Sequence, residues 1–140
     1  MEVKIFLTAD FANTDGAGKL NVLGVFTQIH AHTIPVVLSQ MHVIVQFEFD
    51  SSESGQHRVI FIRLFDPDDK ELITIPNEFD IPQTKYAQTV QINVLAGIQR
   101  MVFEKFGRYS FKLFMGDSHE VSVTVDVLNV TQPREQQSEG

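Results

Sequence analysis

The residues of this chain with the clearest potential for chemistry are acidic side chains in turns. Asp66, Asp68 and Asp69 crowd the segment around Pro67, and Ca²⁺ binds clusters of carboxylate and carbonyl oxygens. Asp-Pro-Asp-Asp is also ordinary type I turn chemistry, in which aspartate side chains cap the backbone. A calcium site would need a second acidic loop nearby, for which the candidates are Asp15, Asp50 and Asp117. The sequence therefore allows two interpretations of this segment, a calcium site and a plain turn.

Other patterns with catalytic or metal-binding potential are incomplete. His30 and His32 would share one face of a strand, as paired metal ligands must, but no third histidine or glutamate follows at a suitable spacing. Gly16 and Gly18 lack the Lys-Ser/Thr ending of a phosphate-binding loop. The chain contains no cysteine, which removes disulfides, thiolate metal sites and cysteine nucleophiles. We expect no enzymatic activity, no cofactor and no resident metal, with an unrecognised hydrolase as a minor alternative.

Charge and composition narrow the classes of partner and the location. The formal net charge is −7, and the 11 basic residues are scattered without a run. Nucleic-acid backbones and anionic membrane surfaces both attract clustered Lys and Arg, so we expect neither as a partner. The opening segment, Met1 to Leu7, is too short and polar for a signal peptide or a membrane-spanning helix. Together with the absence of cysteine, this favours a cytoplasmic protein.

Hydrophobic alternation with a period of two predicts the elements that position these residues. Val121, Val123, Val125 and Val127 alternate with polar residues, and similar stretches recur between clusters of Gly, Asp, Ser, Asn and Pro. The pattern predicts an all-β, antiparallel β-sandwich, Ig-like or C2-like, with about eight strands in two sheets. A closed barrel carries the same alternation and is the alternative fold. We expect one domain over residues 1–130 and a disordered polar tail over residues 131–140.

Three segments carry more detailed expectations. A strand from Val3 to Ala12 should place Val3, Ile5 and Leu7 on one face. A strand over about residues 19–29 looks apolar on both faces and should be central, with Gly24 marking a bulge or a close backbone approach. The segment 98–106 is ambiguous between an irregular strand and one helical turn.

Aromatic residues are the main candidates for an interaction surface. The chain has 12 Phe and no Trp, and one core layer cannot easily hide so many rings. Glycan binding is less favoured, because sugar-stacking aromatics are often Trp or Tyr and only Tyr86 and Tyr109 are present. Four phenylalanines fall on the parity opposite to the main apolar stripe of their strands: Phe6, Phe61, Phe65 and Phe114. We expect them either to be covered within the fold or to form an exposed apolar patch for self-association or partner binding.

The opening of the chain, within residues 7–29, combines Leu7-Thr8-Ala9-Asp10 with Gly18-Lys19-Leu20 and Leu23-Gly24. This combination resembles the start of a family of small, uncharacterised bacterial proteins. A second match, over residues 107–117, places Gly107-Arg108-Tyr109 before the turn at Gly116-Asp117. Val25 stands where that family has a second glycine. The family is a domain of unknown function, so the resemblance implies the fold of residues 2–130 and supplies no catalytic or binding residue.

Two functional hypotheses follow. The first is a non-enzymatic protein-interaction or structural module that binds a protein or a second copy of itself through outward aromatics or a sheet edge. The alternative is a ligand- or calcium-binding sandwich that uses the acidic loops at one end.

Overall fold

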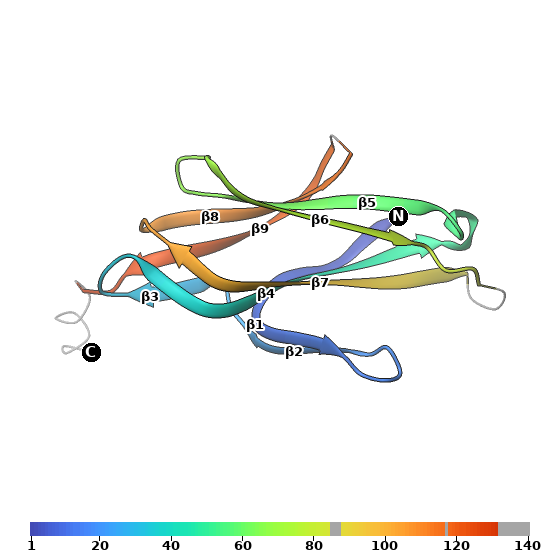
Figure 1. The fold of residues 1–140 in the computed structure, drawn as a ribbon, viewed down its shortest axis with the longest axis horizontal. Helices are drawn as coiled ribbons and strands as arrows, with labels where there is room; N and C mark the ends of the chain where they lie inside the picture. Colours follow the sequence, from blue (N-terminus) through green and yellow to red (C-terminus); the bar gives the residue numbers. More distant parts are fainter. Residues whose placement is uncertain (85–87, 117, 132–140) are drawn as a thin grey trace, which may run out of the picture.

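The computed structural model describes residues 1–84, 88–116 and 118–131, leaving out the side chains of residues 119 and 120. Its strands form two stacked sheets, so the chain is a β-sandwich and not one closed sheet (Figure 1). The four-stranded sheet contains, in spatial order, β2 (Leu20–Val25), β1 (Glu2–Thr14), β4 (Val36–Asp50) and β7 (Thr89–Phe103). The five-stranded sheet contains β3 (Gln28–Ala31), β9 (Ser118–Asn129), β8 (Gly107–Met115), β5 (His57–Phe65) and β6 (Glu71–Asp80).

The predicted fold class is confirmed, with two refinements. The described residues form nine strands where the sequence predicted about eight, and a short 3₁₀ helix, η1 (Ser51–Glu53), follows β4. All strand pairs are antiparallel except β3 with β9, which is parallel. In the described part of the chain, no helix is long and apolar enough to cross a membrane. The predicted tail begins at residue 131, and residues 132–140 lie outside the described residues.

The core between the sheets follows the alternation of the sequence. In β4 every second residue from Met41 to Phe49 is fully buried. The facing sheet contributes Ile60, Ile62 and Leu64 from β5. Rings pack across the gap, with the Phe47 and Phe79 centroids 5.8 Å apart. Because side chains alternate between faces, one buried stripe in each strand is enough to exclude water from between the layers.

Strand β1 changes face near its start, which overturns one expectation. The β1–β4 register shifts between Val3 and Ile5, so that Val3 pairs with Phe47 while Ile5 pairs with Gln46. Val3 and Phe6 therefore pack against the main core, and Ile5 lies on the opposite face. An extra residue in one strand reverses the parity of all residues beyond it. Phe6 is accordingly a core residue and not part of an outward aromatic surface.

The outer face of the four-stranded sheet carries a second, smaller core. The β1–β2 hairpin bends away from the sandwich (Figure 1), and its Ala12, Leu20 and Val22 belong to one apolar cluster with Ile44 of β4 and Leu95 of β7. Ile44 is fully buried there, although it points away from the main core. This cluster explains why β4 has apolar residues on both faces.

The predicted central strand over residues 19–29 was wrong. The segment forms two strands, β2 and β3, and each lies at the edge of a different sheet. The chain crosses between the sheets at Phe26 and Thr27, where Phe26 N–H donates to the Thr8 carbonyl at 3.1 Å and Asp126 N–H donates to the Thr27 carbonyl at 2.9 Å. The apolar residues on both faces therefore reflect a strand that serves two sheets in turn. The prediction for Gly24 is confirmed, because its φ is +72° and a Cβ there would overlap the Asp10 carboxylate.

The ambiguous segment 98–106 is a strand as far as Phe103. It extends β7, which pairs with β4 along its whole length. The buried positions switch parity between Ile98 and Met101, and Arg100 between them has a φ of +57°. A residue in this left-handed conformation bends a strand locally, which is why the sequence pattern was irregular there.

Candidate functional site

Three of the four proposed aromatic residues lie on the outer face of the five-stranded sheet. Phe61 of β5 pairs with Phe114 of β8, and Phe65 lies further along β5. All three are half-buried. The Arg63 guanidinium carbon lies 5.2 Å from the Phe61 ring centroid and 4.8 Å from that of Phe114.

Basic side chains cover much of this aromatic face. The Lys112 ammonium lies 4.5 Å from the Phe65 ring centroid. Arg63 also pairs with Glu71 at 3.8 Å, and Lys112 pairs with Asp69 at 3.7 Å. A cation over an aromatic ring is attracted to the ring face. The face is therefore a cation–π layer held by ion pairs, and not a bare apolar patch.

The carboxylates of the acidic loop between β5 and β6 are hydrogen-bonded to the loop backbone and to Lys105. Asp66 Oδ1 accepts the backbone N–H groups of Asp68 and Lys70, both at 2.9 Å. Its Oδ2 accepts from Lys105 Nζ at 3.2 Å, and Lys105 also donates to Asp68 at 2.5 Å. The Lys70 N–H bond is the main reason that the pKa of Asp66 is lowered, with Lys105 adding to the effect. The Asp68 carboxylate in turn raises the pKa of Lys105.

One candidate for the second acidic loop, Asp15, is far from the first. Asp15 lies in the turn of the β1–β2 hairpin, at the opposite end of the molecule from the β5–β6 turn (Figure 1). Its Oδ1 accepts the backbone N–H groups of Ala17 at 2.8 Å and Lys19 at 2.9 Å. Among the described residues, no three His, Asp or Glu side chains come together in a way that could hold a metal ion. Asp117 lies outside the described residues.

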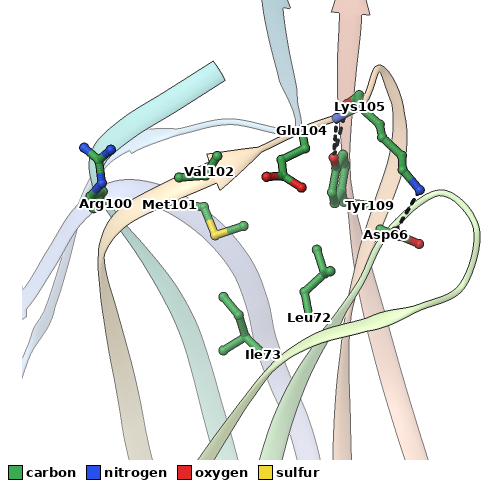
Figure 2. Close-up of a pocket in the computed structure, with 9 residues that line it drawn as sticks. All are labelled: Asp66, Leu72, Ile73, Arg100, Met101, Val102, Glu104, Lys105 and Tyr109. Carbon is green, nitrogen blue, oxygen red and sulfur yellow. Dashed lines mark hydrogen bonds and ion pairs between the residues drawn. The ribbon is translucent and has the colours of Figure 1, made fainter. Parts of the chain in front are cut away.

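A small cleft lies beside the Asp66 loop (Figure 2). It has a volume of about 260 Å³ and is lined by Leu72 and Ile73 of β6, by the end of β7 and by Tyr109. Ligand pockets are typically about 300–1,000 Å³. The cleft is therefore large enough for a side chain of a partner and small for a substrate.

Tyr109 is a buried structural residue beside the cleft and is not a sugar-stacking platform. It is fully buried, and its ring meets Phe103 edge to face at 4.9 Å. Its hydroxyl accepts the Lys105 N–H at 3.0 Å and donates to the Lys105 carbonyl at 3.2 Å. A tyrosine that bonds the backbone just upstream is also a feature of immunoglobulin-type sandwiches. The other tyrosine, Tyr86, lies outside the described residues.

The remaining candidate is the free edge of β7. This strand has 15 residues, and among the described strands it pairs only with β4. From Thr89 to Gln99 it contains neither a charged residue nor a proline. Even-numbered side chains from Val90 to Ile98 pack toward the main core, and the odd-numbered row on the outer face is mostly polar. Exposed strand edges present unpaired N–H and C=O groups that can accept another strand.

Residues 4–128 match the family described as a family of unknown function, DUF6941. The chain belongs to this family. The matched range contains nearly all of the nine strands, which confirms the resemblance drawn from residues 7–29 and 107–117. No curated protein matches the sequence.

The family motifs mark backbone positions and not chemistry in this DUF6941 chain. Gly107 has a φ of +130°, and a Cβ there would lie 2.9 Å from Cγ of Pro67. A Cβ on Gly24 would overlap the Asp10 carboxylate still more closely. Both are places where two segments approach more closely than a side chain allows.

Two exposed regions were missed by reasoning from the sequence. Among the described residues, the most exposed large apolar side chains are Leu23 and Val25 of β2, at 68% and 57%. They were missed because their strand was expected to be central. The β7 edge was missed because nothing local distinguishes an edge strand from a central one. The only available signal was a long strand without charge or proline.

Proposed function

We propose that this protein is a non-enzymatic interaction module that binds a partner strand along β7. The observation that carries the proposal is the combination of length, free edge and absence of charge in one strand. Adding a strand would pair backbone groups that otherwise depend on water. Main-chain hydrogen bonds give affinity in such complexes, and alternate side chains give specificity.

The side chains of β7 suit this mode of binding on both faces. Val90 and Ile92 pack against the core but remain half-buried, so a neighbouring strand would cover apolar surface. On the outer face, Gln91 is exposed and Asn93 accepts a hydrogen bond from Gln46 Nε2 at 2.9 Å. Amide side chains can donate and accept at once, which lets them continue across a new strand.

The hydrogen bonds of the acidic loop support the proposal that the protein is not an enzyme. Asp66, one of two carboxylates that line the cleft together with Glu104, accepts bonds from two backbone N–H groups and Lys105. A general acid or base needs a proton that it can exchange near neutral pH, whereas these bonds stabilise the charged form.

Source, location and partner class form part of the same proposal. We propose a bacterial, cytoplasmic protein, on the basis of the family resemblance and the absence of cysteine. The partner is a protein strand, because the net charge of −7 disfavours nucleic acid and anionic membranes.

The test compares two substitutions within one hydrogen-bonded pair. Asn93→Lys places a charge on the β7 edge, while Gln46→Lys loses the same hydrogen bond and adds the same charge on β4. Each protein is used to select from a random dodecapeptide library displayed on phage, and its mass is measured by analytical ultracentrifugation. We expect wild type and Gln46→Lys either to select extended peptides or to self-associate, and Asn93→Lys to do neither. A wild-type monomer that selects no peptide would overturn the proposal.

A further inference from the structure

We infer that the strand that pairs with β7 is the β7 of a second copy, related by a two-fold axis and antiparallel. This inference rests on the proposed function and names its partner. The pairing would join two four-stranded sheets into one continuous sheet, and in each copy the five-stranded sheet would remain on the same face. Two-fold dimers are the commonest soluble oligomers, and their interfaces must be complementary to themselves.

The first support is the distribution of charge. Two copies of a chain with a net charge of −7 repel each other, so a self-interface needs a surface on which like charges do not meet. Between Thr89 and Gln99, β7 brings no charge to a copy of itself. Like charges placed directly opposite each other would destabilise a strand pair.

The second support is charge complementarity at the two ends of the strand. Arg100 is exposed just beyond Gln99. At the other end, Thr89 pairs with Asp50 and Gln91 pairs with Glu48 on the neighbouring β4. An antiparallel copy would bring its Arg100 toward the Thr89 end, where these two carboxylates lie one strand further in. The same attraction would occur twice, once at each end, and a parallel copy would lack it.

The third support is the pattern of the two faces. Side chains opposite each other in neighbouring strands lie on the same face of a sheet. A two-fold axis through the strand pairs even-numbered residues with even-numbered ones, so the core-facing row (Val90, Ile92, Val94, Ala96 and Ile98) would meet its own copy. The outer row would likewise place its amides opposite the outer row. Gln and Asn suit this arrangement, because an amide is both donor and acceptor toward an identical amide.

The decisive experiment uses complementary charges at one position. Sedimentation of wild type and Gln46→Lys should show a dimer that dissociates on dilution. Asn93→Lys should raise the dimer dissociation constant at least about tenfold, and Asn93→Asp should do the same. An equimolar mixture of the Lys and Asp variants should then recover the dimer, since opposite charges would meet near the two-fold axis. Only an interface in which position 93 of one copy approaches position 93 of the other predicts this recovery.

The remaining outcomes separate this inference from the proposal beneath it. Suppose that the wild type is a monomer that selects library peptides and that Asn93→Lys selects none. This result would overturn the inference that the partner is a second copy and would leave the β7 edge as the binding site. A dimer that is unaffected by Asn93→Lys, or equally weakened by Gln46→Lys, would overturn the β7 interface between copies. A monomer that selects nothing would overturn both.

Discussion

The two flanks of the sandwich are built in opposite ways. On one flank, the chain passes from sheet to sheet between β2 and β3, and hydrogen bonds at Thr8, Phe26 and Thr27 tie the layers together. On the other flank, β6 and β7 are both edge strands of their own sheets. All four strands are sheet edges, but only Phe26 and Thr27 separate β2 from β3, whereas residues 81–88 separate β6 from β7. The flanks therefore differ in how closely the chain ties the two edges together.

The two strands of the open flank also differ from each other. β6 has Pro76 in its middle and the exposed acids Glu71, Glu78 and Asp80 along its length. Proline and charge are the usual means by which proteins prevent a strand edge from pairing. β7 is longer and has neither over its first eleven residues. Because the edge of β6 is protected and the edge of β7 is not, β7 is the candidate interface.

The largest expected effect tests the difference between the flanks. Thr8 is fully buried, and its hydroxyl donates to the Phe26 carbonyl at 2.5 Å. Thr8→Val keeps the shape but leaves that carbonyl without this donor, so we expect a loss of about 1–3 kcal/mol in the free energy of unfolding. Urea denaturation measures it. Thr89→Val, the same change at an exposed position on β7, should alter stability by less than about 0.5 kcal/mol. Equal losses in the two variants would remove the contrast.

A second prediction removes the protection of β6. Pro76→Val combined with Glu78→Thr replaces both guarding residues with strand formers, so β6 should become able to pair. We expect association beyond the wild-type state, measured as an increase in mass by light scattering at matched concentration. Thr74→Val, which adds apolar surface but keeps Pro76 and Glu78, is the control and should behave as wild type. If the double variant also has the mass of the wild type, Pro76 and Glu78 are not the residues that protect the β6 edge.

The smallest expected effect concerns an ion pair next to the guarded edge. His57 Nδ1 lies 2.7 Å from Asp80 Oδ1, and this hydrogen bond, followed by that to Glu78, raises the pKa of His57. Protonated His57 therefore stabilises the fold below its ordinary pKa of about 6.5, and the contribution is lost as pH rises through the higher folded value. Because the group is exposed, the fall in Tm should be small, on the order of 1 °C.

The pH effect is measured as a difference between two proteins. Melting curves of wild type and His57→Gln are compared across pH 5.5–8.5, in steps of roughly half a pH unit, so that effects of pH common to both proteins cancel. The difference in Tm should be largest at the acid end and vanish at the alkaline end. A difference that grows with pH would show that the pair does not stabilise the fold in the expected sense.

Much of the fold could be predicted because its signals are local. The alternating valines of β9 face the core, as their period of two predicted, with Val125 and Val127 buried. The errors arose where one residue changed a face or a strand changed sheets. Phe6 was misplaced by the register shift after Val3, and β2 and β3 were read as one strand. Neither event alters the composition of the segment enough to be visible.

The candidate site was predicted only in part for a related reason. Phe61, Phe65 and Phe114 do lie on an outer face, but whether Arg63 and Lys112 cover them depends on cross-strand pairing. The acidic turn was visible in the sequence, whereas its separation from Asp15 follows from the path of the chain (Figure 1).

The amino-acid sequence by itself determined that this chain forms stacked sheets, since the period of two decides which side chains water can reach at each position. Tertiary structure decided which strands have a neighbour on both sides. That property depends on the order of strands within each sheet, set by contacts between segments far apart in the chain. The uncharged stretch of β7 could equally have filled the centre of a sheet, and only its position at the edge makes it a surface for another strand.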